Sequence, residues 1–483
     1  MKGLGLLAAL LAVGAPALGQ DGDAPRDAVV EGAWMGQLRA GATQVRMVFH
    51  IVRQPAGLLG ATLDVPEQGA RAIPVETASF DPPALTLNVR VIGASFEGRL
   101  SADRTRIVGT WRQGGGTYAL TLVRTENPPD VRRPQEPRLP LPYTQKDVTV
   151  ENAAAAVRLA GTLTVPSGPG PHPAVILISG SGPQDRDQTV FGHRPFLVLA
   201  DHLTRQGIAV LRLDDRGVGG STGSTRTATT KDFADDVKCA VDVLKARPEI
   251  DASRIGLLGH SEGGIVAPIV AAARADIAFI VLLAGTGLPG EQILYLQAAA
   301  IARAGGAPES AIATSRRINE RIYAEARSDA PATEVATRVR AVLQQTVDSM
   351  TAAERAALGP SVDTWIDVQV NTVTSPWFRH FLSYDPRPAL RAVRCPVLVL
   401  IGERDLQVPA RENAAEIEAA LKAGGGADAT VRIVPGVNHL FQTAATGLPT
   451  EYGVIEETMS PSVLTMVSEW ILARARRSRP AGR

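Results

Sequence analysis

Short apolar segments alternate with helical segments from Asp147 to the end of the chain, and this alternation constrains the fold most strongly. The apolar runs are rich in Val, Ile and Leu, which is typical of strands buried on both faces. Strands that alternate with helices form a mostly parallel sheet covered by helices on both sides. The expected strands are residues 148–151, 157–165, 174–178, 208–213, 254–258, 278–283, 397–401 and 431–434, of which the first two are expected to be antiparallel.

One long interval interrupts this alternation. Residues 288–390 show no strand pattern, only helical segments at 291–303, 311–326 and 333–350. Such an interval is far longer than an ordinary connection between two strands of one sheet. The sequence therefore predicts a helical cap inserted into an α/β domain that spans residues 143–483.

The chain before the α/β domain has a different pattern. Residues 28–125 alternate apolar and polar side chains with frequent Gly and Pro, which predicts a small antiparallel β-sandwich or β-barrel. Residues 126–142 are dense in proline, which fixes φ and removes backbone donors. We expect this segment to be an extended spacer between the two domains.

The first residues of the chain have the pattern of a targeting segment. Lys2 precedes an apolar stretch at residues 4–13, and a small-residue site follows at Ala17-Leu18-Gly19. This order is typical of a secretory signal peptide, here residues 1–19. The apolar stretch is too short for a permanent membrane anchor. We expect a secreted or periplasmic protein with no stable membrane insertion after cleavage.

Charge and cysteine content argue against several classes of protein. The 483 residues include 50 basic and 49 acidic side chains, a formal net charge of +1, which disfavours a nucleic-acid-binding surface. The two cysteines, Cys239 and Cys395, are too few for a disulfide framework and are expected to be buried free thiols. No metal and no organic cofactor is predicted.

The motif with the most chemical content is Gly259-His260-Ser261-Glu262-Gly263-Gly264. It follows an expected strand and precedes the helical run 265–273. A serine on a sharp strand-to-helix turn is held in a strained conformation with its hydroxyl exposed, and the flanking glycines leave room for that turn. An ordinary serine in a glycine turn is the alternative. The strand before the motif and the helix after it favour Ser261 as a nucleophile.

A serine nucleophile needs a base and an orienting acid, which in this arrangement follow it in the order acid, then histidine. Asp405 follows the strand expected at 397–401, and His439 follows the strand expected at 431–434. Glu403 is the rival acid, but it lies nearer the strand end. Of the seven histidines, His439 alone follows a late strand.

The negative charge that forms during acyl transfer needs two backbone N–H donors, together called an oxyanion hole. Glu262, the residue after the nucleophile, is expected to supply one. The loop after the strand at 174–178 is expected to supply the other, from Ser181 or from its neighbours Gly180 and Gly182.

Two further charged motifs require an interpretation. Residues 184–187, Gln-Asp-Arg-Asp, are predicted to anchor a loop by ion pairs, with substrate contact as the alternative. Residues 214–223 contain glycines that resemble a dinucleotide loop, but no helix begins within them as that fingerprint requires. We interpret the second motif as a structural loop beside the site.

The chain from Tyr143 onward resembles bacterial α/β-hydrolases of the carboxylesterase and serine-aminopeptidase-like groups, and the β region resembles the N-terminal domain of some secreted members. The matching segments are 178–187, 214–223, 259–264, 402–405 and 438–441, with 64–69 and 109–111 in the β region. The resemblance implies an esterase that acts on short- to medium-chain acyl esters, such as feruloyl-like or acetylated substrates. Ser179 departs from the pattern, because many relatives have histidine before the oxyanion glycine.

Three functions remain open at this point. The first is a carboxylesterase for a small-molecule ester. The second is an aminopeptidase or other amidase, which would need a cap carboxylate for the substrate amine, with Glu320, Glu325 and Asp367 as candidates. The third is a binding protein without catalysis, which the complete set of Ser261, Asp405 and His439 disfavours.

Aromatic residues near the end of the cap are candidates for the substrate pocket. Trp377, Phe378 and Phe381 concentrate much of the chain's scarce aromatic content. They are expected to form an acyl or alcohol pocket, with the core of the cap as the alternative. The sequence leaves the oligomeric state and the role of the β domain open.

Overall fold

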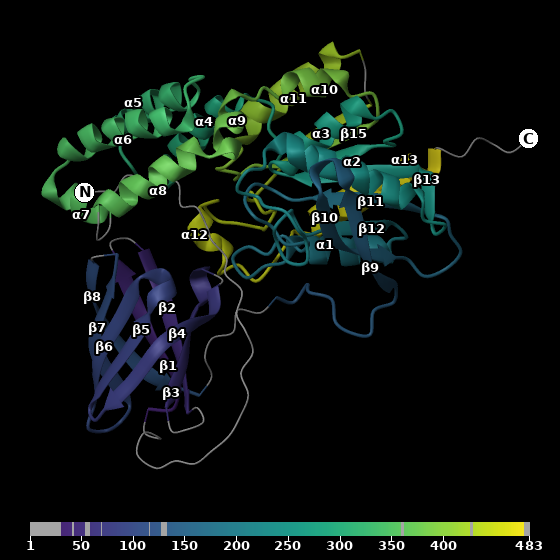
Figure 1. Ribbon diagram of the computed structural model, residues 1–483. Coiled ribbons are helices and arrows are strands. Elements are labelled where there is room, and N and C mark those ends of the chain that lie inside the picture. Colours follow the sequence, from purple (N-terminus) through teal and green to yellow (C-terminus); the bar gives the residue numbers. More distant parts are fainter. Residues whose placement is uncertain are drawn as a thin grey trace, which may run out of the picture.

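The computed structural model describes residues 30–40, 43–53, 58–68, 70–114, 116–126, 133–358, 362–425 and 428–477. It consists of an N-terminal β-barrel and a larger α/β part that carries a group of helices (Figure 1). The predicted signal peptide, residues 1–19, lies outside the described residues.

The N-terminal part is a closed antiparallel barrel in which each strand pairs with the next and the first pairs with the last. Its strands are β1 (Gly32–Ala40), β2 (Thr43–Arg53), β3 (Leu59–Val65), β4 (Ala70–Asp81), β5 (Ala84–Val89), β6 (Ala94–Leu100), β7 (Arg106–Gln113) and β8 (Gly116–Thr125), and short 3-10 turns lie at η2 (Pro66–Gln68) and η3 (Arg90–Ile92). Closure pairs every strand edge, so the alternation of apolar and polar residues here builds a barrel rather than a sandwich.

Large aromatic side chains fill the inside of the barrel. Trp34, Phe49, Phe96 and Trp111 are fully buried, and the ring centroid of Phe49 lies 6.1 Å from the rings of both Phe96 and Trp111. An eight-stranded barrel is just wide enough for side chains to fill it. The interior is therefore a packed core.

The α/β part is built on a single eight-stranded sheet, as the sequence predicts. The strands are β9 (Thr144–Asn152), β10 (Val157–Val165), β11 (His172–Ile178), β12 (Ala209–Leu213), β13 (Ile250–His260), β14 (Ile280–Leu283), β15 (Val397–Gly402) and β16 (Ala429–Val434). Their order is β16-β15-β14-β13-β11-β12-β10-β9. β9 and β10 are antiparallel to their neighbours, and the other pairs are parallel. This is the α/β-hydrolase fold, so the predicted fold class is confirmed.

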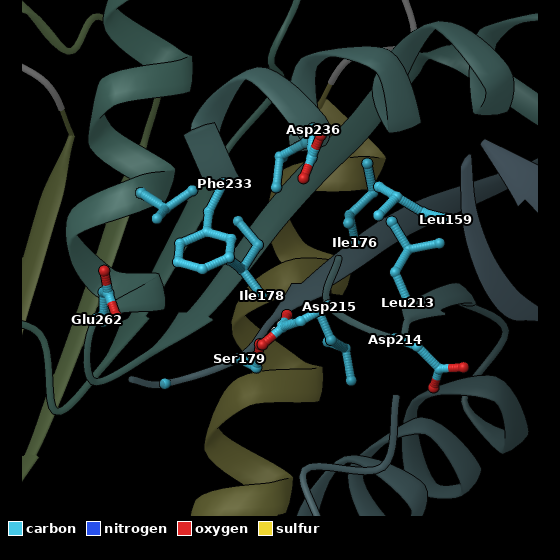
Figure 2. Close-up of a pocket in the computed structure, with 14 residues that line it drawn as sticks. Leu159, Ile176, Ile178, Ser179, Leu213, Asp214, Asp215, Phe233, Asp236 and Glu262 are labelled. Atoms are coloured by element: carbon cyan, nitrogen blue, oxygen red, sulfur yellow. Dashed lines mark hydrogen bonds between the residues drawn. The ribbon is translucent and has the colours of Figure 1, made fainter. Parts of the chain in front are cut away.

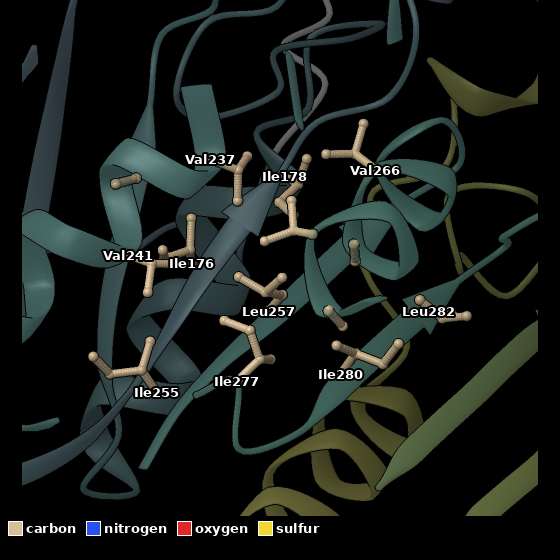
Figure 3. Close-up of a cluster of buried hydrophobic side chains, with 14 of the residues drawn as sticks. Ile176, Ile178, Val237, Val241, Ile255, Leu257, Val266, Ile277, Ile280 and Leu282 are labelled. Atoms are coloured by element: carbon tan, nitrogen blue, oxygen red, sulfur yellow. The ribbon is translucent and has the colours of Figure 1, made fainter. Parts of the chain in front are cut away.

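Both faces of the sheet are buried, and alternate residues of each strand serve opposite faces. Ile176 and Leu257 pack in one apolar cluster, whereas their neighbours Val175 and Leu258 pack in a second cluster on the other face. Figure 3 shows part of the first cluster, between the sheet and two helices. The first face is covered by α2 (Thr230–Lys245), α3 (Gly263–Ala273) and α11 (Ala410–Ala423), and the second by α1 (Pro195–Arg205) and α13 (Pro461–Arg477).

The predicted cap is present between β14 and β15 and is entirely helical in its described residues. Its helices are α4 (Gly290–Ala304), α5 (Glu309–Ala326), α6 (Ala332–Asp348), α7 (Ala352–Ala357), α8 (Val362–Thr374), α9 (Pro376–Ser383) and α10 (Arg387–Ala392). The cap has its own apolar core, and Ile265 of α3 belongs to that core. The cap is thus packed onto the helix that follows the candidate nucleophile.

The described part of the proline-rich segment, from residue 133 onward, has no helix or strand, but it is not a free spacer. The Arg133 guanidinium donates hydrogen bonds to four backbone carbonyls, those of Phe191, Gly192, Gly453 and Ile455, at 2.8–3.2 Å. The Gln135 side chain adds hydrogen bonds to the backbone of residues 458–459. The described part of the segment therefore lacks regular structure, as its proline density predicts, but the two side chains that flank Pro134 anchor it to the α/β part.

A four-residue helix, α12 (Pro449–Tyr452), brings the barrel and the α/β part together. The η2 turn of the barrel lies against α12, and Figure 1 shows α12 on the side of the α/β part that faces the barrel. The segment held by Arg133 begins directly after α12. Both N-terminal parts of the chain therefore meet the α/β part at one place.

Two smaller predictions can also be compared with the structure. Cys239 and Cys395 are free thiols as expected, but they are partly rather than fully buried. Among the described helices, none has the length and apolar character needed to cross a bilayer.

Candidate active site

Ser261 occupies the sharp turn between β13 and α3. Its φ is +54°, in the left-handed region that a serine rarely adopts. A Cβ on Gly259 would lie 1.9 Å from the carbonyl oxygen of Gly263, and a Cβ on Gly263 would lie 2.1 Å from that of Ile178. These two positions admit no side chain, so the glycines of the motif are required by the tight turn.

His439 and Asp405 meet at the same edge of the sheet as Ser261. The Nδ1 of His439 lies 2.8 Å from Oδ2 of Asp405, and both residues are buried. Oδ1 of Asp405 accepts hydrogen bonds from the backbone N–H groups of Gln407 and Val408. Because an ionised carboxylate only accepts, the proton lies on Nδ1 and leaves Nε2 as an acceptor.

Glu403, the rival acid, has a different role. Its side chain is exposed and accepts a hydrogen bond from the backbone N–H of Gly436 at 2.9 Å. It supports the loop before His439 and makes no contact with the imidazole in the described residues. The geometry pairs His439 with Asp405.

The loop after β11 lies directly against the candidate nucleophile. A Cβ on Gly180 would lie 3.3 Å from Cβ of Ser261. Ser261 is partly exposed, and its hydroxyl has no hydrogen bond with any of the described residues. Catalytic hydrogen bonds are often long in a free enzyme and tighten when substrate binds.

The backbone donors near Ser261 differ in whether they are already occupied. The N–H of Gly180 donates to Oε1 of Gln188 at 3.2 Å, which removes Gly180 from the oxyanion candidates. The N–H groups of Ser181, its neighbour Gly182 and Glu262 donate to no acceptor in the described part of the chain. Two unoccupied donors beside the nucleophile are what an oxyanion hole needs.

The side chain of Glu262 joins three parts of the molecule. It is buried and accepts hydrogen bonds from the hydroxyl of Thr230 at 2.6 Å and from the indole N–H of Trp377 at 2.8 Å. Burial raises the pKa of Glu262, and the two hydrogen bonds oppose that rise. The residue after the nucleophile is thus tied to the start of α2 and to α9 of the cap.

The three aromatic pocket candidates do not share one environment. Phe378 and Phe381 are buried in the core of the cap. Trp377 is partly exposed, stacks on Phe381 at 5.2 Å and reaches Glu262. Trp377 is therefore the member of this set that lies beside the site, and its contact with substrate stays a prediction.

The two charged motifs are structural, as predicted. Arg186 makes a bidentate ion pair with Asp214, with distances of 3.0 and 2.7 Å, and Arg212 pairs with Asp187. Asp214 also accepts a hydrogen bond from the N–H of Gly220. The ion pairs tie the loop after β11 to the loop after β12.

A cavity of about 40 Å³ lies behind the loop after β11, residues 179–183, here called the oxyanion loop after its predicted role. The cavity is lined by Ser179, Asp215, Phe233 and Glu262 among others (Figure 2). Asp215 accepts hydrogen bonds from the Ser179 hydroxyl at 2.9 Å and from the N–H of Gln184 at 3.0 Å. Burial raises the pKa of Asp215 to about 8, and the nearby charge of Glu262 adds to the rise. Ser179, which departs from the family pattern, thus holds a carboxyl group at the base of this loop.

The cap carboxylates proposed as amine anchors are all paired with arginines. Glu320 pairs with Arg316 at 2.7 Å, Glu325 with Arg338 at 3.4 Å, and Asp367 with Arg340.

No cluster of three or more metal-ligating side chains occurs among the residues that the structure describes.

Sequence reasoning missed two residues that contact the site. Gln188 bonds Gly180 and His260, and Thr230 bonds Glu262. Gln188 lies one residue beyond the Gln-Asp-Arg-Asp motif, and Thr230 lies at an ordinary helix start. No periodicity or spacing distinguishes either from a surface residue.

The arrangement defines a hydrolase built on an α/β sheet, and the sequence comparisons agree. The chain matches the model of the Alpha/beta hydrolase family over residues 175–447, more than half of its length. It belongs to that family.

Named relatives give further comparison. The chain is 25% identical over 339 residues to Esterase EstD of Thermotoga maritima, covering 69% of this chain and 68% of the relative. Solved structures include the α/β hydrolase GrgF from Penicillium sp. sh18, 17% identical over 69% of this chain and 98% of that chain, with a TM-score of 0.42. An esterase of Pyrococcus furiosus is also 17% identical, over 69% of this chain and 91% of that chain, with a TM-score of 0.40.

The raised pKa of Asp215 predicts a pH-dependent stability that Asp215→Asn should remove. The folded state holds a proton up to about pH 8, whereas the unfolded chain releases it near 3.8, so the wild type loses stability as pH rises between these values. Asparagine can keep both partners, because its amide donates to Ser179 and its oxygen accepts from Gln184. We expect the Tm difference, variant minus wild type, to grow from pH 5 to pH 8 and then level off in thermal melts. A difference that is constant with pH would contradict the assignment.

Proposed function

We propose that this protein is a serine hydrolase that cleaves small-molecule carboxylic esters through an acyl-enzyme on Ser261. The observation that carries the proposal is the buried Asp405–His439 pair at the same sheet edge as a strained serine turn. The unoccupied N–H groups of Ser181 and Glu262 support it, because they supply donors for a tetrahedral intermediate.

In the proposed reaction, Oγ of Ser261 attacks the ester carbonyl carbon while Nε2 of His439 takes the hydroxyl proton. The carbonyl oxygen becomes negative and is held by the N–H groups of Ser181 and Glu262. The ester C–O bond then breaks, and His439 gives its proton to the leaving alkoxide, which departs as an alcohol. Water repeats these steps on the acyl-enzyme and releases a carboxylic acid and free Ser261. Asp405 orients His439 throughout.

Two observations favour an ester over an aminoacyl substrate. The cap carboxylates that were candidates for an amine anchor are occupied by arginines. A relative that is 25% identical to this chain over 339 residues bears the name esterase. The proposed reaction uses protein groups and water and needs no metal or cofactor.

Removal of either Ser261 or His439 should abolish turnover. Ser261→Ala and His439→Ala should each lower kcat for p-nitrophenyl acetate by roughly 10⁶, and the double variant by little more, because the groups act as a unit. Asp405→Asn should cost about 10⁴. Glu403→Gln is the matched control and should retain wild-type activity. Additive losses, or a larger effect of Glu403→Gln than of Asp405→Asn, would contradict the triad.

A substrate panel distinguishes the esterase from the amidase. We expect faster turnover of p-nitrophenyl esters than of aminoacyl-p-nitroanilides, measured as kcat/KM over several acyl lengths. Faster turnover of the anilides would replace the proposal with an aminopeptidase. A wild-type protein that a fluorophosphonate probe fails to label would favour a binding protein without catalysis.

We also propose that the protein is exported to the periplasm or the medium, on the basis of the signal-peptide pattern in residues 1–19. The mature chain should begin near Gln20 when the exported protein is sequenced from its N-terminus. Leu7→Arg, which breaks the apolar stretch, should leave the full-length chain in the cytoplasm. An intact Met1 on exported protein would contradict cleavage.

A further inference from the structure

The Gln188 side chain links the oxyanion loop to a histidine beside the nucleophile. Its Oε1 accepts a hydrogen bond from the N–H of Gly180 at 3.2 Å, and its Nε2 lies 2.9 Å from Nδ1 of His260. The other ring nitrogen of His260, Nε2, lies 2.9 Å from the carbonyl oxygen of His439. Gln188, His260 and His439 are all buried, with 3%, 5% and 4% exposure.

The direction of each hydrogen bond follows from the chemistry of the groups. The backbone N–H of Gly180 can only donate, so it fixes the carbonyl end of the Gln188 amide. The NH₂ end then donates to Nδ1 of His260, which must be unprotonated. The ring proton is on Nε2 and is donated to the carbonyl oxygen of His439. One arrangement satisfies every group.

Gln188 holds this position at a conformational cost. Its φ is +52°, a left-handed conformation that is uncommon for a residue with a side chain. Such strain persists only where the surrounding structure fixes it, and it gathers at functional sites. The unfavourable backbone conformation of Gln188 places its amide between Gly180 and His260.

Neutral His260 also suits the charge that the proposed reaction creates. The His260 and His439 rings lie 4.8 Å apart, and Phe441 flanks His260 at 6.4 Å. Burial lowers the pKa of His260 to about 3, and the charge of His439 adds to the effect. A second positive charge at this distance would oppose the imidazolium that His439 becomes in the transition state.

We infer that Gln188, acting through His260, is a positioning residue that fixes the oxyanion loop and the backbone of His439 relative to each other. This inference rests on the proposed function, since it gives Gln188 a role only if His439 is the base. The side-chain hydrogen bonds of Gln188 go to Gly180 and His260, not to the side chains of Ser261, His439 or Asp405 in the described residues. Its removal should move the N–H donors and the imidazole relative to each other.

The test compares Gln188→Met, Gln188→Glu and a control far from the site. Met keeps the volume and removes both hydrogen bonds. Glu keeps the acceptor for Gly180 but replaces the donor to His260 with a carboxylate, which favours a proton on Nδ1. The control is Thr164→Val, which removes a buried hydrogen bond between the hydroxyls of Thr164 and Thr204. This pair lies near the start of β12, whereas the candidate site lies at the carboxyl ends of the parallel strands.

The readouts are the rate of fluorophosphonate labelling at Ser261 and the kcat and KM of an ester, on folded protein of matched circular dichroism. Gln188→Met should lower the labelling rate and kcat by roughly 10- to 100-fold with KM nearly unchanged, because small misplacements of reacting groups have effects of this size. Thr164→Val should label at the wild-type rate.

Gln188→Glu should lower kcat with KM nearly unchanged, because a carboxylate cannot donate to Nδ1 of His260 and the hydrogen bond between the two loops is lost. This variant decides the question if Gln188→Met fails to fold. Wild-type labelling rates in Gln188→Met, or a wild-type kcat in Gln188→Glu, would overturn the inference while leaving the proposed function intact. A wild-type protein that is not labelled would remove the proposed function, and the role of Gln188 with it.

Discussion

The close approach of β11 to the start of α3 is the constraint on which the site depends. The Cα of Gly263 faces the carbonyl oxygen of Ile178 at a spacing that admits no side chain, and Gly259 meets Gly263 in the same way. The chain can turn from strand to helix in this space only by placing Ser261 in the left-handed region. The turn leaves Ser261 partly exposed and brings its Cβ against Gly180, in the loop after the neighbouring strand β11. Serine and oxyanion loop are thus positioned by one steric contact.

Buried hydrogen bonds then tie this turn to parts of the molecule that steric fit alone would leave independent. On one side, Glu262 connects the turn to α2 and to Trp377 of the cap. On the other, His260 connects it to the carbonyl of His439. Both residues directly flank Ser261, so their side chains leave the turn in different directions. A carboxyl or imidazole group is costly to bury without hydrogen-bond partners. The bonds of Glu262 therefore favour one position of the cap, and the bond of His260 favours one position of the loop that carries His439.

The sheet and its strand-following residues were predictable because their signals are local. Val, Ile and Leu runs mark strands buried on both faces, and Asp405 and His439 each follow such a run by a few residues. Gln188 and Thr230 were not predictable, because their roles depend on a left-handed backbone and on partners far along the chain. Phe378 and Phe381 show another limit, since an aromatic residue on a cap helix has the same pattern whether it faces a pocket or a core. The contacts of residues 133–135 were also not predictable. A high proline density indicates that a segment lacks helix and strand, but it does not indicate whether its side chains contact the rest of the molecule.

The contacts of residues 133–135 connect the N-terminal part of the chain to the loop that carries Asp405. Arg133 holds the backbone of Gly453 and Ile455, directly after α12, and η2 of the barrel lies against the same helix. Tyr452, the last residue of α12, is buried and its hydroxyl accepts a hydrogen bond from the Gln407 side chain at 3.3 Å. The backbone of Gln407 in turn donates to Oδ1 of Asp405. These contacts connect η2 and Arg133 to α12 and the residues after it, and α12 through Gln407 to Asp405. In the part of the chain that the structure describes, the barrel and the segment from Arg133 thus meet the α/β part at a helix that is hydrogen-bonded to the loop of Asp405, and neither places a side chain beside Ser261 or His439.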